Sequence, residues 1–102
     1  MKKYDYSVVL DTELGKRKGT MQILVNENKV EGFLNLLKHT EPIYGNINID
    51  GSCRLQGKIV TLIKEIAYIA TGHIDSDELL LNFQIGAHSY LLKGFPFKGE
   101  EN

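Results

Sequence analysis

Apolar and polar residues alternate along most of this 102-residue chain, and this period of two constrains the fold more than any other feature. In residues 43–50, for example, Ile43, Ile47 and Ile49 alternate with polar or aromatic neighbours. A strand that buries one face and exposes the other requires this pattern, whereas an amphipathic helix requires a period of about 3.6. We therefore predict an all-β fold. The predicted strands are residues 4–12, 19–25, 29–37, 42–50, 52–61, 65–74, 78–85 and 88–95.

Turn signals separate these strands. Asp50-Gly51 between two alternating segments is a strong hairpin signal. The segment from Gly15 to Gly19 is interpreted as a charged hairpin tip. Regularly spaced turns of this kind are typical of an antiparallel sandwich or barrel, and the chain length suits one domain. We predict a single antiparallel meander barrel or barrel-like sandwich of about eight strands over residues 1–97, followed by a polar tail at residues 98–102.

One stretch also fits a helix. Apolar residues between Ile59 and Ala70 recur at helical spacing, and Gly72 stands where a C-cap would lie. Many of these residues are β-branched, however, and β-branched side chains favour strands. We expect a hairpin that turns at residues 62–64. An α+β fold with one helix near residues 58–71 is the alternative.

Six glycines share a position within the predicted strands. Each stands two residues before an apolar residue or a proline, so the period of two places all six on the inward face. Glycine inside a strand costs roughly 0.5–1 kcal/mol relative to alanine, which indicates a shared geometric need. Glycine can let strands bend and approach closely, or it can open a cavity, and we favour bending. The six are Gly19, Gly32, Gly45, Gly57, Gly72 and Gly94.

The composition excludes several classes of protein. Twelve Lys and Arg stand against thirteen Asp and Glu, a net charge of -1, whereas proteins that bind nucleic acid usually carry a basic excess. No run of about 18 apolar residues is present, so no segment is predicted to span a membrane. We expect neither a nucleic acid nor a membrane as a partner.

The single cysteine and the N-terminal residues indicate the cellular compartment in which the protein acts. Cys53 is the only cysteine, so no disulfide can form within the chain. The apolar segment Val8-Val9-Leu10 is shorter than the roughly 7–15 residues that an export signal needs. We therefore predict a cytoplasmic protein.

Several turn and glycine motifs carry a resemblance. They are T-x-L-G-x-x-x-G-T from Thr12 to Thr20, A-T-G-H-I-D-S-D-E-L from Ala70 to Leu79, and G-F-P-F-K-G from Gly94 to Gly99. They resemble the T-P-M-G…G-T and F-P-F-x-G repeats of a group of small bacterial all-β proteins, although Glu13 and Leu14 replace the Pro and Met of that pattern. The resemblance covers most of the chain and implies a lipocalin-like meander barrel. It implies no activity and no functional residue.

No constellation of catalytic or metal-binding residues is recognised. The three histidines lack the H-x-x-x-H and H-E-x-x-H spacings, and a zinc site needs three or four convergent ligands. Phosphate-binding glycine loops and the G-x-S-x-G motif are missing. Cys53 lies on a predicted inward face, where a free thiol usually behaves as a small hydrophobe. We expect a non-enzymatic protein without a cofactor or a metal.

Two functions of different kinds are favoured, and an enzyme is kept as a remote third alternative. The first is a binding module that forms a homodimer through apolar residues on the outer face, since a contiguous apolar patch marks a partner surface. The second is a carrier of a small apolar ligand inside the barrel. The candidate interface residues are Phe33, Leu37, Phe95 and Phe97. The candidate ligand-binding residues are Tyr6, Tyr68, Tyr90 and Cys53.

Overall fold

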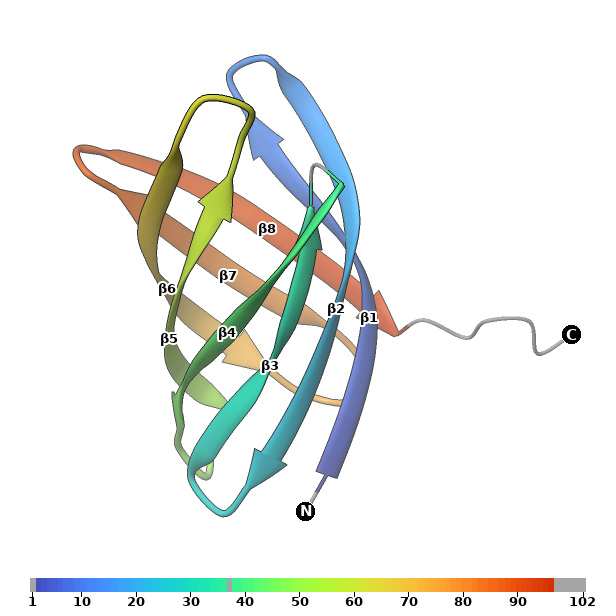
Figure 1. The fold of residues 1–102 in the computed structure, drawn as a ribbon. Helices are drawn as coiled ribbons and strands as arrows, with labels where there is room; N and C mark the ends of the chain where they lie inside the picture. Colours follow the sequence, from blue (N-terminus) through green and yellow to red (C-terminus); the bar gives the residue numbers. More distant parts are fainter. Residues whose placement is uncertain (1, 37, 97–102) are drawn as a thin grey trace, which may run out of the picture.

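Eight antiparallel strands form a closed barrel (Figure 1). The structure is a computed structural model that describes residues 2–36 and 38–96. Each strand pairs with its neighbours along the chain, and β1 also pairs with β8, so the sheet closes on itself. The strands are β1 (Lys2–Thr12), β2 (Gly15–Asn26), β3 (Lys29–Leu36), β4 (His39–Ile47), β5 (Ser52–Val60), β6 (Glu65–Ile74), β7 (Leu79–Ile85) and β8 (His88–Pro96).

The predicted fold class is confirmed, and the helical alternative is wrong. Residues 58–71 form the end of β5, a turn at residues 61–64 and the start of β6. Thr61 closes that turn by accepting the backbone N–H of Lys64 on its hydroxyl oxygen. The hairpins β1–β2, β3–β4, β5–β6 and β7–β8 lie at one end of the barrel, called here the upper end (Figure 1). The β2–β3, β4–β5 and β6–β7 turns form the lower end.

The charged tip predicted at residues 15–19 is wrong. The β1–β2 turn consists of Glu13 and Leu14 alone, because Thr12 pairs directly with Gly15. Gly15 has a φ of +114°, a conformation that glycine adopts without strain. Residues 16–18 are therefore part of strand β2, and their side chains alternate between the inward and outward faces of the barrel.

Packed side chains fill the interior of the barrel. Phe83, Ile23 and Ile43 are completely buried, and the ring of Phe83 stacks on that of Tyr68 with the centroids 4.3 Å apart. Every strand contributes, because the inward positions near the middle of each strand are mostly apolar. The core residues are Tyr6, Val8, Leu10, Met21, Ile23, Val30, Leu34, Leu36, Ile43, Cys53, Leu55, Ile59, Tyr68, Ala70, Ile74, Leu79, Leu81, Phe83 and Leu92.

The six strand glycines face inward as predicted, and at all of them except Gly94 a backbone atom of a neighbouring strand occupies the space that a side chain would need. A Cβ added to Gly72 would collide with the carbonyl oxygen of Leu80 and come within 2.9 Å of the Cα of Leu81, the residue that pairs with Gly72. Gly32 and Gly45 have the same relation to the strands beside them. The glycines therefore let the sheet coil tightly, and the bending explanation holds.

A carboxylate organises the β6–β7 turn and gives a pH prediction. Asp75 Oδ1 accepts the backbone N–H groups of Glu78 (2.9 Å) and Asp77 (2.7 Å), and these bonds hold the pKa of the Asp75 carboxyl below its usual value. A carboxyl whose pKa is lower in the folded than in the unfolded state stabilises the fold above its unfolded pKa, and this contribution is lost as the pH falls through the folded pKa. We expect the free energy of unfolding to decrease below about pH 4.

Urea unfolding measured between about pH 2 and pH 6 tests this expectation. In Asp75→Asn the free energy of unfolding should decrease less at acid pH than in the unaltered protein, because the amide does not titrate. Asp77→Asn is the matched control, since it removes the same charge from the same turn and leaves the backbone donor of residue 77 in place. An equally small decrease in both variants would contradict the role given to Asp75.

Candidate functional site

The first candidate ligand residue, Tyr6, is part of the core near the lower end. Its side chain is 1% exposed, and its hydroxyl donates a hydrogen bond of 2.5 Å to the carbonyl oxygen of Asp75. Burial, followed by the nearby Tyr4, raises the pKa of the Tyr6 hydroxyl above its ordinary value. The Tyr6 hydroxyl therefore links β1 to the β6–β7 turn. Because it donates its hydrogen to the protein backbone, it does not donate to a ligand.

The other two tyrosines lie elsewhere in the barrel. Tyr68 is 3% exposed, its hydroxyl has no hydrogen-bond partner among the described residues, and burial raises the pKa of that hydroxyl. Tyr90 is only partly buried and lines an open cleft at the upper end. The structure thus does not gather Tyr6, Tyr68 and Tyr90 into one pocket.

Cys53 is also part of the core. Its side chain is 8% exposed and points inward from β5, and burial raises the pKa of the thiol to about 11. A thiol with such a pKa is almost entirely protonated at neutral pH and reacts slowly. Cys53 is therefore a packing residue of the core. Because its thiol reacts slowly, it should not interfere when a second cysteine is introduced at the surface for chemical labelling.

Two of the four candidate interface residues can be placed. Phe33 on β3 is 51% exposed, and Phe95 on β8 is 55% exposed. Strands β1 and β2 lie between them, and the outward side chains there include Ser7 and Gln22, so the two rings do not form one patch. Leu37 and Phe97 lie outside the described residues.

Apolar side chains gather around Phe33 on the outer face of β2, β3 and β4. Phe33 pairs with Pro42 across β3 and β4, and the next outward row holds Leu24, Glu31 and Tyr44. Leu24 is 37% and Tyr44 is 48% exposed. We call Leu24, Phe33, Pro42 and Tyr44 the β2–β4 patch.

The β2–β4 patch borders a groove of about 630 Å³. Ile23, Gly32 and Ile43 contribute to the lining of this groove, and the side chains of both isoleucines point into the core. Two charged side chains of opposite sign, Lys3 and Glu31, also line the groove. The groove is therefore lined by the apolar side chains of the β2–β4 patch together with one charged side chain of each sign.

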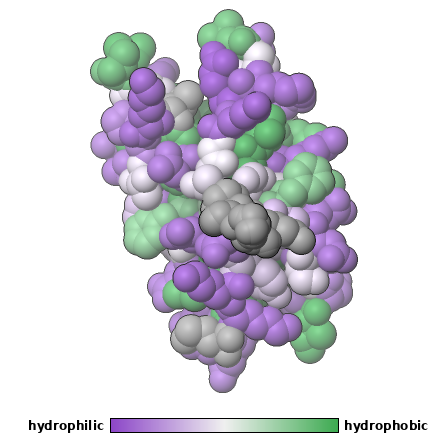
Figure 2. Space-filling view, turned by 90° about the vertical axis from the view of Figure 1, so that its right-hand side faces the viewer, coloured by the Kyte–Doolittle hydropathy of each residue, from purple (hydrophilic) through white to green (hydrophobic). Residues whose placement is uncertain are grey.

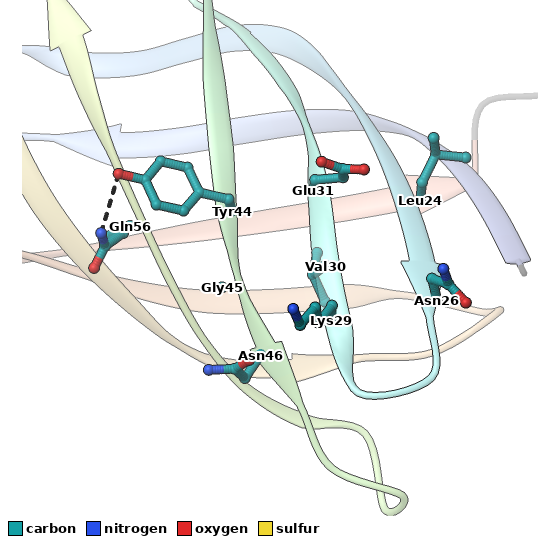
Figure 3. A pocket seen from close by; sticks show the side chains of 9 residues that line it. All are labelled: Leu24, Asn26, Lys29, Val30, Glu31, Tyr44, Gly45, Asn46 and Gln56. Atoms are coloured by element: carbon teal, nitrogen blue, oxygen red, sulfur yellow. Dashed lines mark hydrogen bonds between the residues drawn. The ribbon is translucent and has the colours of Figure 1, made fainter.

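A second hollow of about 480 Å³ adjoins the first on the same face (Figure 3). The two share Leu24, Glu31 and Tyr44, which form a ridge between them. The ring of Tyr44 points toward β5, and its hydroxyl accepts a hydrogen bond of 3.1 Å from Gln56 Nε2 (Figure 3). This bond fixes one aromatic side chain of the patch on the surface.

The register between paired strands explains why the sequence alone did not identify some of these features. Pro42 and Leu24 are not among the candidate residues, because the pairing that brings them beside Phe33 and Tyr44 depends on three strands at once. The charged tip predicted at residues 15–19 includes Arg17. Its inward position could have been found, since Met21 and Gly19 set the parity that Arg17 continues.

No protein family model, curated protein or solved structure matches the chain. Across residues 2–36 and 38–96, no group of three or more His, Cys, Asp or Glu side chains could hold a metal ion. That part of the chain also contains no helix long and apolar enough to cross a membrane.

Proposed function

We propose that the protein is a non-enzymatic binding module that forms a homodimer through the β2–β4 patch, and that it acts in the cytoplasm. The observation that carries the proposal is the groove of about 630 Å³ beside two half-exposed aromatic rings, Phe33 and Tyr44. Aromatic side chains are enriched at the centres of protein interfaces because they bury a large area with few rotatable bonds. Phe33 is the expected centre of the contact.

The charges favour a second copy of this chain as the occupant. Lys3 and Glu31 lie on opposite sides of Leu24, in one row across three strands. A two-fold interface brings the same surface together twice, and a surface that carries both signs of charge can complement itself. The net charge of -1 also produces little repulsion between two copies.

Cross-linking through an introduced cysteine tests the location of the interface. Gln22 is exposed, lines the groove and pairs with Phe33. In a two-fold dimer centred on the patch, the two copies of residue 22 lie close together. We expect Gln22→Cys to give a covalent dimer with a short bismaleimide, detected by denaturing electrophoresis.

The chain offers two controls. Thr71→Cys places an equally outward thiol on β6, on another face of the barrel, and should give only a faint collisional product. The unaltered protein should not cross-link, because the thiol of Cys53 is buried. Equal cross-linking of the Gln22 and Thr71 variants, or none with Gln22→Cys, would refute the proposed interface.

A further inference from the structure

An open cleft of about 390 Å³ lies at the upper end of the barrel. The hairpins β1–β2 and β5–β6 both project from this end (Figure 1), and the space-filling view shows two projections there with apolar tips and a notch between them (Figure 2). Leu14 at the tip of the first hairpin and Thr61 in the turn of the second both line the cleft. Two separate hairpins therefore form its walls.

The wall and floor of the cleft are largely aliphatic. Leu10, Ile59, Ile66 and Ile85 line it, each from a different strand. Leu14 is 84% exposed, so the described part of the chain leaves this aliphatic side chain almost uncovered. Turn positions usually hold polar residues, and a leucine there extends the apolar wall of the cleft into solvent.

One cation faces this apolar surface. Arg17 pairs with Leu10 across β1 and β2, and because Leu10 points inward, so does Arg17. Within the described residues no carboxylate lies within ion-pair distance of Arg17, and its guanidinium donates only a long hydrogen bond of 3.4 Å to the carbonyl oxygen of Lys16. A guanidinium presents several donors to a carboxylate, so most of its binding capacity is free.

Two other charged side chains lie near Arg17, and neither forms an ion pair with it. Lys16 forms an ion pair of 3.3 Å with Asp11 on the outer face. Among the residues that the structure describes, Glu13 is the one carboxylate that lines the cleft, and its Oε2 lies 3.9 Å from Nδ1 of the exposed His88. The cleft therefore combines an aliphatic surface with one unpaired cation at its edge.

We propose that this cleft binds a single-chain amphipathic anion, of which a fatty carboxylate is the simplest example, with the carboxylate on Arg17 and the alkyl chain between the two hairpins. Bidentate hydrogen bonds between guanidinium and carboxylate are strong and directional. The volume lies near the lower end of the range of about 300–1,000 Å³ for small-molecule sites, which suits one alkyl chain rather than two. Tyr90, a candidate ligand-binding residue, lines this cleft. Tyr6, Tyr68 and Cys53 are instead buried in the core.

Isothermal titration with decanoate, kept below its micelle-forming range, tests the proposal. We expect decanoate to bind and decanol, which has the same chain and no charge, to bind at least about tenfold more weakly. Arg17→Met should weaken decanoate binding by a similar factor, and Arg17→Lys by less. Lys18→Met is the matched control, because Lys18 lies on the same strand with its side chain outward, and it should bind decanoate as the unaltered protein does.

A second variant tests the sign of the electrostatic effect. Glu13→Gln removes a negative charge from the cleft and should tighten decanoate binding by a few-fold. Failure of decanoate to bind, equal binding of decanol, or unchanged binding by Arg17→Met would overturn the proposal. The site lies apart from the β2–β4 patch, so Phe33→Glu should bind decanoate normally, and loss of the dimer would leave this result unaffected.

Discussion

Replacing Gly72 with alanine is expected to lower the free energy of unfolding by about 3 kcal/mol or more, the upper part of the range for overpacked sites. The added Cβ would overlap the carbonyl oxygen of Leu80, and backbone atoms of β7 cannot move away without breaking the β6–β7 ladder. Urea unfolding followed by circular dichroism measures the change, and a constant slope against urea would show that the denatured state is unaltered.

Gly94→Ala is the matched control for that experiment. A Cβ at Gly94 would lie 3.0 Å from Leu79 Cδ2, 3.0 Å from Val8 Cγ1 and 3.2 Å from Leu79 Cβ, so side-chain atoms rather than backbone must give by a few tenths of an ångström. Replacing glycine also reduces the entropy of the unfolded chain, which offsets about 0.4–1 kcal/mol of the loss. We therefore expect Gly94→Ala to be nearly neutral. Similar losses at both positions would contradict the close approach of the strands.

The same geometry recurs around the barrel. A Cβ at Gly32 would meet the carbonyl oxygen of Gln22, and one at Gly45 would meet that of Arg54. In both cases, as at Gly72, the oxygen belongs to the residue that precedes the cross-strand partner. A repeated contact of this kind indicates that the coiling of the whole sheet depends on these positions, so alanine at Gly32 or Gly45 should destabilise as strongly as at Gly72.

The strands could be predicted because one face of each strand is buried in the core and the other face is exposed to solvent. Buried positions on β5 and β7 are apolar at every second residue, which a period of two reveals directly. Strand ends are harder to predict, because the turn Glu13-Leu14 lacks the Asn-Gly or Asp-Gly pair that marks a two-residue hairpin. Gly15 and Lys16 look like loop residues, yet they extend β2 because Glu13 and Leu14 suffice to reverse the chain.

The surface sites could be predicted only in part. Phe33 and Phe95 look equivalent in sequence, since each is an aromatic residue at an outward position, but the order of strands separates them. The pairing that gathers Leu24, Pro42 and Tyr44 around Phe33 joins residues from three strands. Pattern reasoning recognises single strands, whereas a patch or a cleft depends on the registers between them.

Phe33→Glu is expected to convert the dimer into a monomer. The substitution places a charge at the proposed centre of an apolar contact, where an unpaired carboxylate would have to be desolvated. Loss of a hot-spot residue at the centre of an interface costs about 2 kcal/mol or more, which is about a thirtyfold weakening of association. The fold should be unaffected, because the ring of Phe33 is half exposed and lies outside the core.

Phe95→Glu introduces the same charge at an equally exposed aromatic residue on β8, and it should leave association unchanged. The most direct test is sedimentation velocity of the unaltered protein and both variants over a range of concentrations. We predict a concentration-dependent dimer for the unaltered protein and Phe95→Glu, and a monomer for Phe33→Glu. A monomer at every concentration for the unaltered protein, or a dimer that persists in Phe33→Glu, would contradict self-association through the β2–β4 patch.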